Sequence, residues 1–420
     1  MNTNRRQFIG GIGALAASTF PMPALAQAKP KVVVVGGGPG GATVAKYVAK
    51  DGGIDVTLVE PARRFTTCFH SNLYLGGFKT FEEITHSYDK ITKAYGIKHM
   101  RQLASAIDRD KKQVKFASGK ALDYDRLVLA PGIDIKFDSV PGYSQEVAKK
   151  LLHAWQAGPQ TQLLRRQLNA LSDGSTIVMV APPNPYRCPP GPYERASMMA
   201  HVLKAKGHKK SRIIILDPKE NFSKQGLFME GWQKHYPGMI EWQDGKMHGG
   251  IKGVDAKTMT VKTDLAEHKA NLINVIPAQM AGKIARDAAL ANQTGYCPIN
   301  PENMRSTIDA NIYIVGDACI PGDMPKSGFS ANSQAKVAAM MVRGELANGR
   351  TFPARYTNTC WSLIETDDTV KVGGTYGAKD GKIAATETFV SKTGESAELR
   401  KQTQQENMGW YQGIIADIFT

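Results

Sequence analysis

Three features of the 420-residue chain predict an α/β fold. A run of four valines within residues 31–50 is followed by a glycine-rich turn that opens a helix. A second strand–helix–strand pattern occupies residues 175–217, and residues 356–420 follow neither pattern. Continuous apolar runs are typical of buried parallel strands. The predicted architecture is therefore two Rossmann-like dinucleotide-binding-type domains plus a smaller C-terminal interface domain.

Residues 1–28 have the pattern of an export signal, so they are excluded from the fold. Arg5 and Arg6 precede a weakly apolar stretch, and Ala24, Ala26 and Ala28 supply a small-residue cleavage site. The RRxFI pattern is typical of the twin-arginine route, which carries folded cargo. It predicts a periplasmic protein.

The composition limits which classes of binding partner the sequence predicts. The net charge of +15, of which Arg5 and Arg6 supply two charges, is scattered along the chain. It favours an acidic protein partner or an anionic substrate over nucleic acid, and simple solubility explains it equally well. After the signal no apolar run reaches roughly eighteen residues, so no transmembrane segment is predicted. The chain lacks a CxxCH haem-attachment motif, and no metal site is predicted.

The stretch "KVVVVGGGPGGATVAKYVAK" is the first nucleotide-binding element. Gly36 makes the tight turn, Gly38 allows close approach of a pyrophosphate, and Gly41 lets helix and strand pack closely. The next strand, "DVTLVE", ends in Glu60, which is placed to accept the ribose hydroxyls. The helix N-terminus adds its positive dipole end.

Two later strands indicate that the dinucleotide is FAD. "YDRLVLAPG" ends in Pro131 and Gly132, and "NIYIVGDA" ends in Gly316 and Asp317. Both resemble accessory motifs of FAD enzymes with two dinucleotide domains, in which the aspartate binds the ribitol chain. A helix is expected from Ser327 to Val342, with Lys326 at the pyrimidine edge of the flavin. The alternative is an exposed lysine before an ordinary core helix.

The second unit has an unusual loop, "APPNPYRCPPGPYERA", between its first strand and a helix expected from Tyr193. Prolines have no N–H to offer a phosphate, and Gly191 is the one glycine there. Although Arg187 and Arg195 remain available to an anion, we expect no NAD(P)H site.

Five cysteines are an odd number, so at least one is free or bonded to another group. Cys188, in the proline-rich loop, and Cys360, in "YTNTCWSLIE", can form a redox-active disulfide over a flavin; alternatively, Cys188 is a buried thiol or half of a structural disulfide. Cys68, in "RRFTTCFHSNLYLGG", is placed near the flavin ring, either free or bonded to a ring methyl. We interpret Cys297 and Cys319 as small apolar core residues.

Together, "TTCFHSN", "RCPPGPYERAS", "VGDACI", "MPKSGFSANSQ" and "NTCWS" resemble the flavoprotein subunits of flavocytochrome c sulfide dehydrogenases. Sulfide:quinone reductases and type II NADH dehydrogenases are wider relatives. The resemblance implies a thioether from Cys68 to FAD, a Cys188–Cys360 disulfide over the flavin, and Glu194 as a proton handler. It also implies a c-type cytochrome partner. The region after Cys360 follows the pattern only loosely.

The expected domains are an FAD domain over 29–150 and 285–355, a second nucleotide-type domain over 151–284, and a cap over 356–420. The predicted activity is FAD-dependent oxidation of sulfide to sulfur or polysulfide, with cytochrome c as acceptor. The alternatives are a sulfide:quinone reductase and a flavin-carrying sulfur-binding protein without turnover. Apolar spacing from Met408 to Ile418 predicts a terminal helix that covers the flavin, faces the cytochrome or lies on a membrane, with Trp410 near the ring.

Overall fold

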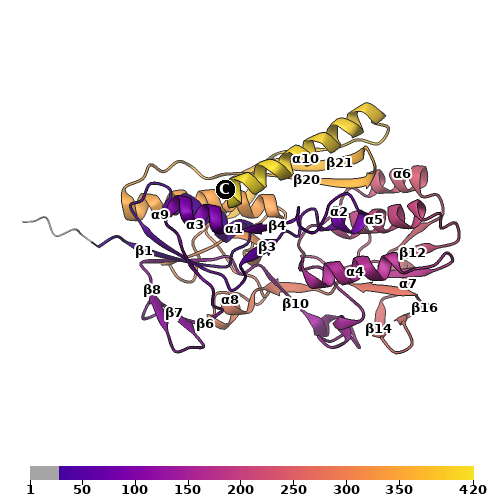
Figure 1. Ribbon diagram of the computed structural model, residues 1–420, viewed down its shortest axis with the longest axis horizontal. Coiled ribbons are helices and arrows are strands. Elements are labelled where there is room, and N and C mark those ends of the chain that lie inside the picture. Colours follow the sequence, from indigo (N-terminus) through magenta and orange to yellow (C-terminus); the bar gives the residue numbers. More distant parts are fainter. Residues whose placement is uncertain (1–27) are drawn as a thin grey trace, which may run out of the picture.

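The computed structural model describes residues 28–420. The predicted export signal, apart from Ala28, lies outside the described residues. Two parallel sheets stand side by side along the long axis of the molecule, and a third, antiparallel sheet and a long terminal helix lie along one edge (Figure 1). The fold matches the predicted α/β class with its separate C-terminal region.

The first sheet is built from the glycine-rich unit and two distant segments. Its strand order is β19-β9-β1-β2-β5, all parallel, and Val32–Val34 of β1 are almost fully buried. The N-terminal helix α1 packs against the long helix α9 over this sheet. The elements are β1 (Lys31–Val35), α1 (Pro39–Ala49), β2 (Asp55–Val59), β5 (Lys98–Met100), β9 (Arg126–Leu129), β19 (Ile312–Ile314) and α9 (Gly328–Ala347).

The second sheet has the order β13-β12-β11-β17, again all parallel. Its central helix, α5, begins at Gly191, two residues before the predicted start, and its first turn is buried. The elements are β11 (Thr176–Val180), α5 (Gly191–Ala205), β12 (Arg212–Leu216), α6 (Gln225–His235), β13 (Ile240–Gln243) and β17 (Leu272–Val275).

The C-terminal region is an antiparallel sheet crossed by a 23-residue helix. Strand β21 (Asp368–Lys379) lies between β20 (Arg355–Glu365) and β22 (Lys382–Val390), and α10 (Ala397–Phe419) packs on β20 and β21. Helix α10 runs along the upper edge of Figure 1, above both parallel sheets. Its apolar residues Tyr411, Ile414 and Ile418 are buried, so the predicted apolar spacing is its docked face.

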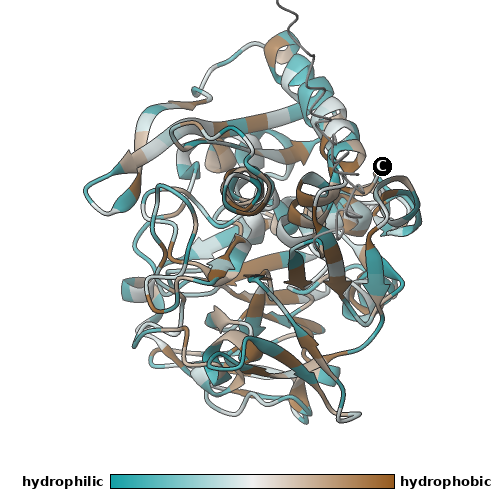
Figure 2. Cartoon of the chain, turned by 90° about the vertical axis from the view of Figure 1, so that its left-hand side faces the viewer, coloured by the Kyte–Doolittle hydropathy of each residue, from teal (hydrophilic) through white to brown (hydrophobic). Residues whose placement is uncertain are grey.

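Small elements complete the framework. Apolar residues concentrate in the strands of the interior, and hydrophilic residues on loops and outer helix faces (Figure 2). The strands are β3 (Arg64–Thr66), β4 (Thr85–Ser87), β6 (Ala104–Asp108), β7 (Gln113–Phe116), β8 (Ala121–Asp123), β10 (Ile133–Ile135), β14 (Ile251–Asp255), β15 (Thr260–Thr263), β16 (Glu267–Lys269) and β18 (Gln279–Ala281). The helices are α2 (Ser71–Gly76), α3 (Asp89–Tyr95), α4 (Pro159–Asn169), α7 (Gly245–His248) and α8 (Lys283–Asp287).

Across residues 28–420, none of the helices combines the length and the apolar character that crossing a bilayer requires.

Candidate active site

The glycine-rich turn between β1 and α1 leaves no room for side chains. A Cβ on Gly36 would lie 2.3 Å from the carbonyl oxygen of Ala130, and a Cβ on Gly41 would lie 1.8 Å from that of Gly36. Gly36 also has a φ of +102°, which favours glycine. The turn is therefore held tightly between the ends of β1 and β9, as the spacing predicts.

A trough of about 260 Å³ runs along this turn. Its walls include most of the predicted cofactor residues, and Cys68 and Arg187 close one part of it. The Gly37 N–H donates to Oε2 of Glu60 over 2.9 Å, which fixes this carboxylate beside the glycines. The predicted residues that line the trough are Gly36, Gly38, Glu60, Cys68, Pro131, Gly132 and Asp317.

One carboxylate oxygen in the trough lacks a partner that FAD could supply. Oδ2 of Asp317 accepts from Arg187 over 3.4 Å, whereas its buried Oδ1 has no hydrogen-bond partner within the described chain. An unsatisfied buried carboxylate oxygen is costly, and the ribitol hydroxyls of a flavin nucleotide are the donors that the sequence assigns to it. The residues that would hold FAD are therefore the glycine turn, Glu60 and Asp317.

Lys326 is buried, so its interpretation as an exposed lysine is wrong. Its ammonium donates to the carbonyl oxygens of Asp317, over 2.8 Å, and Cys319, and it lies 4.0 Å from the ring centre of Tyr296. Burial lowers its pKa. Ser327 caps α9 by accepting from the Ser330 N–H, so the predicted helix start is correct, and the helix extends five residues beyond Val342.

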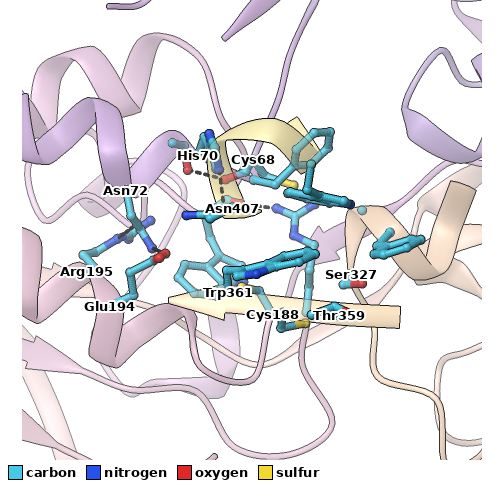
Figure 3. A pocket seen from close by; sticks show the side chains of 18 residues that line it. Cys68, His70, Asn72, Cys188, Glu194, Arg195, Ser327, Thr359, Trp361 and Asn407 are labelled. Atoms are coloured by element: carbon cyan, nitrogen blue, oxygen red, sulfur yellow. Dashed lines mark hydrogen bonds between the residues drawn. The ribbon is translucent and has the colours of Figure 1, made fainter. Parts of the chain in front are cut away.

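Three cysteines from distant parts of the sequence line one cavity (Figure 3). Cys68 follows β3, Cys188 lies in the proline-rich loop before α5, and Cys360 is in the middle of β20. Cys68, Arg187 and Gly328 also line the FAD trough, so the cavity and the trough share a wall. Within residues 28–420 all five cysteines are free thiols. The Cys188–Cys360 disulfide therefore stays a prediction.

Burial raises the pKa of all three cavity thiols. After burial, the next largest cause of the raised pKa of Cys188 is electrostatic repulsion by Cys360, so the two sulfurs lie close enough to interact. Cys188 has a φ of +60°, in the left-handed region, and its N–H donates to the Lys326 carbonyl over 2.8 Å. The loop is thus tied to the segment that opens α9.

Glu194 links α5 to β20 beside Cys360. It is 8 % exposed. Its Oε1 accepts from the Leu363 N–H over 3.0 Å, and its Oε2 accepts from Asn72 Nδ2 over 2.8 Å. Burial raises its pKa, while these two donors oppose the rise. Figure 3 shows Glu194, Asn72 and Arg195 clustered at one side of the cavity. A buried carboxyl with a raised pKa is suited to holding a proton.

Arg195 does not meet an anion as the sequence suggested. It is 1 % exposed, and its guanidinium is used by Asn72 Oδ1, Asn274 Oδ1 and the carbonyls of His153 and Ala154. Burial lowers its pKa to about 9. It is a structural cation of the cavity wall.

Lys224 and Asn72 were missed by sequence reasoning. Lys224 precedes α6 in the unremarkable stretch "NFSKQGLF", yet it is buried, and its ammonium donates to the Cys360 carbonyl over 3.0 Å. Burial lowers its pKa to about 8. Only the long-range packing of α6 on β20 brings it to the site, so no local signal marks it.

Aromatic side chains form the remaining walls. The buried indole nitrogens of Trp155, Trp361 and Trp410 and Nδ1 of His70 have no hydrogen-bond partner within the described chain. All four residues line the cavity. Trp410, from α10, confirms that the terminal helix covers this cavity. Four unpartnered buried polar atoms around one space indicate a site for a polar or anionic group.

The carboxylate that follows the second strand of the second nucleotide-type unit is enclosed by aromatic side chains. Strand β12 ends at Leu216, and the next residue, Asp217, is fully buried. Its Oδ2 accepts from the Tyr193 hydroxyl over 2.5 Å and from Trp242 Nε1 over 3.0 Å. Phe222 stacks on Tyr193 with ring centres 3.6 Å apart. Tyr193 and Trp242 thus use Oδ2 of this carboxylate for hydrogen bonds within the protein.

Cys297 and Cys319 lie away from the cavity. Their backbones form an isolated parallel β-bridge, and both side chains are fully buried, as predicted for small core residues. Burial raises their pKa values to about 12 and about 11. No cluster of three potential metal ligands among His, Cys, Asp and Glu occurs in the part of the chain that the structure describes.

Comparisons with known proteins agree with this geometry. A family model for the central domain of the "Sulfide dehydrogenase [flavocytochrome c] flavoprotein chain" matches residues 161–277, and one for "Flavocytochrome c sulphide dehydrogenase, flavin-binding" matches residues 352–419. A sulfide dehydrogenase flavoprotein chain from Chlorobaculum thiosulfatiphilum is 63% identical over 43 residues, which are 10% of this chain and 90% of that sequence. The chain belongs to the flavocytochrome c sulfide dehydrogenase flavoprotein family.

More distant relatives extend this family assignment. A pyridine nucleotide-disulphide oxidoreductase model matches residues 30–178 of this chain. A mitochondrial sulfide:quinone oxidoreductase from Dictyostelium discoideum is 22% identical over 73% of this chain and 69% of its own length. The solved sulfide:quinone oxidoreductase from Aquifex aeolicus has a TM-score of 0.70 at 18% identity, covering 93% of this chain and 91% of its own. NDH2 from Plasmodium falciparum, solved with NADH, has a TM-score of 0.68 at 12% identity, covering 93% and 98%. These structures support the fold.

Proposed function

We propose that this chain oxidises sulfide with bound FAD, uses Cys188 and Cys360 as a reversible disulfide, and passes the electrons to a c-type cytochrome subunit. One observation carries the proposal. Cys188 and Cys360, far apart in the sequence, line a single cavity that adjoins the FAD trough at Cys68. Membership of the sulfide dehydrogenase flavoprotein family supports sulfide as the substrate.

The reaction starts from the oxidised cysteine pair. Hydrosulfide attacks one sulfur of the disulfide, forms a persulfide on it and releases the other sulfur as a thiolate. A second hydrosulfide attacks the outer sulfur of the persulfide and carries it away as disulfide anion, which leaves two reduced cysteines. FAD, when bound in the trough, supplies the acceptor for the two electrons that re-form the disulfide, and it can pass electrons on singly.

The protein residues control protons and charge in this cycle. Burial raises the pKa of Cys188 and Cys360, so the reduced pair favours the thiol form. Glu194, bonded to Asn72 and the Leu363 N–H, is placed to accept the protons released on re-oxidation. The cavity has a volume of about 70 Å³, which admits small species such as hydrosulfide and few others.

Three finer points belong to the same proposal. Cys68 bonds FAD covalently through its sulfur, which is supported by its place in both the trough and the cavity. The twin-arginine pattern supports export to the periplasm, where c-type cytochromes are available. The aromatic closure of Asp217 supports a cycle without NAD(P)H.

The acceptor has one serious alternative, because several relatives are sulfide:quinone oxidoreductases. Tyr411, Ile414 and Ile418 of α10 are packed inward. These three apolar residues of the terminal helix are therefore not available to a membrane surface, and this favours the cytochrome.

The test is sulfide-dependent reduction of the acceptor by purified protein with its flavin. Cys188→Ser and Cys360→Ser should each abolish turnover while FAD stays bound. Cys297→Ala, which alters a buried cysteine outside the cavity, is the matched control and should retain turnover. Each protein is assayed with cytochrome c and with a soluble quinone. Sustained turnover of Cys188→Ser with either acceptor would remove the disulfide from the mechanism, and turnover with quinone alone would replace the cytochrome.

A further inference from the structure

Lys224 is a buried cation without a carboxylate partner in the described chain. Its side chain is enclosed between α6 and the C-terminal sheet, and its Nζ donates to three neutral oxygens: the Cys360 carbonyl, the Ser362 hydroxyl and the Val370 carbonyl, over 3.0, 2.8 and 3.4 Å. Burying an ammonium is costly unless a negative charge compensates it. The anionic groups available to it are Glu194 and the sulfurs of Cys360 and Cys188.

The surroundings of Cys360 are suited to a negative sulfur. The carbonyl of the same residue accepts from Lys224, and the Nδ2 of Asn358 donates to its Sγ over 3.4 Å. The Ser327 hydroxyl donates to Asn358 Oδ1 over 2.6 Å, which orients the amide toward the sulfur. Cys360 therefore has both a side-chain donor and a nearby positive charge.

Cys188 has no side-chain donor to its Sγ among the described residues, and the cation beside it, Arg187, is hydrogen-bonded to Asp317. Its Sγ packs against Gly191, where an added Cβ would lie 2.9 Å away. The start of α5 offers it little, because Pro190 and Pro192 have no N–H and the Gly191 N–H donates to the Cys188 carbonyl. The Glu194 carboxyl, in the same turn, opposes a negative charge on Cys188.

On the basis of the proposed function, we propose that hydrosulfide attacks Sγ of Cys188, and that Cys360 is the sulfur that leaves, as a thiolate held by Asn358 and Lys224. In thiol–disulfide exchange the better-stabilised thiolate leaves faster. After burial, Asn358 and Lys224 lower the pKa of Cys360 and the opposing effect of Glu194 is smaller. At Cys188, Cys360 and Glu194 raise the pKa further, and the opposing effect of Arg187 is smaller.

The step balances. The S–S bond between Cys188 and Cys360 breaks, and a new S–S bond joins the sulfide sulfur to Cys188. The electron pair of the broken bond stays on Cys360. The proton of hydrosulfide stays on the persulfide or passes to solvent through Glu194. The oxidant that the step requires is the disulfide itself, which the bound flavin or an added diamide-type oxidant forms beforehand.

The experiment locates the persulfide on the full-length protein with its flavin. The protein is oxidised with diamide, mixed with one equivalent of sulfide, quenched rapidly with an alkylating reagent and digested for mass spectrometry. The inference expects the extra sulfur on the Cys188 peptide and a singly alkylated thiol at Cys360. Extra sulfur on Cys360 would overturn the direction of attack and leave the proposed function standing. Sulfide neither consumed nor bound by the oxidised pair would overturn both.

A second measurement tests Lys224 as a positioning residue. In the reduced protein near neutral pH, Lys224→Met should slow alkylation of Cys360 by roughly tenfold, since one pKa unit changes the thiolate fraction tenfold. The alkylation rate of Cys188 should change less. Lys224→Arg keeps the charge and should restore the rate at Cys360, and Lys246→Gln, at an exposed site, should match the wild type. Equal slowing at both cysteines would show a merely structural effect and overturn the assignment.

Discussion

His70 should make the contact between α10 and the cavity sensitive to acid. Its ring stacks on Tyr411 with centres 4.1 Å apart, its Nε2 bonds Asn407 Oδ1 over 2.9 Å, and the side chain is buried. Both partners lie on α10. Burial lowers the pKa of His70 from 6.5 to about 4. The neutral ring is therefore the form that the folded protein accommodates.

The sign and size of the effect follow from this shift. Between about pH 6.5 and pH 4 the unfolded chain binds a proton at this histidine and the folded chain does not, so stability is complete above this window and falls as the pH falls through it. At about 1.4 kcal/mol per pKa unit, the depression corresponds to about 3 kcal/mol. His153, also buried with its pKa lowered to about 4, should contribute a similar loss.

The assay compares how steeply the free energy of unfolding changes with pH in different variants. The free energy of unfolding is measured by urea titration from about pH 7 to pH 4.5 for the wild type, His70→Asn and His153→Asn. Asparagine tolerates the left-handed backbone of His70, whose φ is +63°. Each variant should lose part of the histidine-dependent slope, whatever constant penalty it carries, and the double variant should lose more than either. His86 and His268, whose pKa values burial also lowers, should keep the rest. A His70→Asn slope equal to that of the wild type would refute the reasoning.

Three further outcomes are expected. Gly41→Ala should lower stability by at least about 2 kcal/mol and release FAD, because its Cβ would lie 1.8 Å from a carbonyl oxygen, whereas Gly413→Ala, with no atom within 4 Å, should be neutral or stabilising by thermal melting. Acid-precipitated wild-type protein should keep its yellow colour and Cys68→Ser should lose it, as read by absorbance of pellet and supernatant. Sulfide should bleach the flavin absorbance and NADH should leave it unchanged, because Asp217 is held by Tyr193; bleaching by NADH would show that this unit opens.

The sequence predicted those parts of the site whose chemistry depends on local backbone geometry. A glycine turn between a strand and a helix has few alternatives, so Gly36, Gly41 and Glu60 lie where their spacing indicates. The helix capped by Ser327 follows the same logic. The roles of the cavity cysteines were predicted from the distinctive motifs that flank them, so that prediction depends on resemblance to a known family and not on local geometry.

The remaining groups could not be predicted because only tertiary packing gives them a role. Asn72 and Lys224 occupy ordinary helical contexts, and their partners are a carboxylate on α5 and a carbonyl on β20. Lys326 was predicted at the pyrimidine edge of the flavin from its place before α9, but the sequence left an exposed lysine open, because its burial depends on Tyr296 and on the turn after β19. Periodicity reports which face of an element is buried, and it does not report what that face meets.

The charges around the cavity explain why the cysteine pair sits where it does. Lys224 and Arg195 are both buried cations. Among residues 28–420 the carboxyl that acts on both is Glu194, and burial raises the pKa of Glu194 toward the neutral form. Arg187 is occupied by Asp317. The proposed disulfide carries no charge, so with the cysteines in that form the site would hold more positive than negative charge. Attack of an anion on that disulfide would add a negative charge between the cations. The buried cations, which destabilise the resting protein, would then stabilise the thiolate that is released. In the proposed mechanism, the excess of buried cations is therefore what favours attack by hydrosulfide electrostatically.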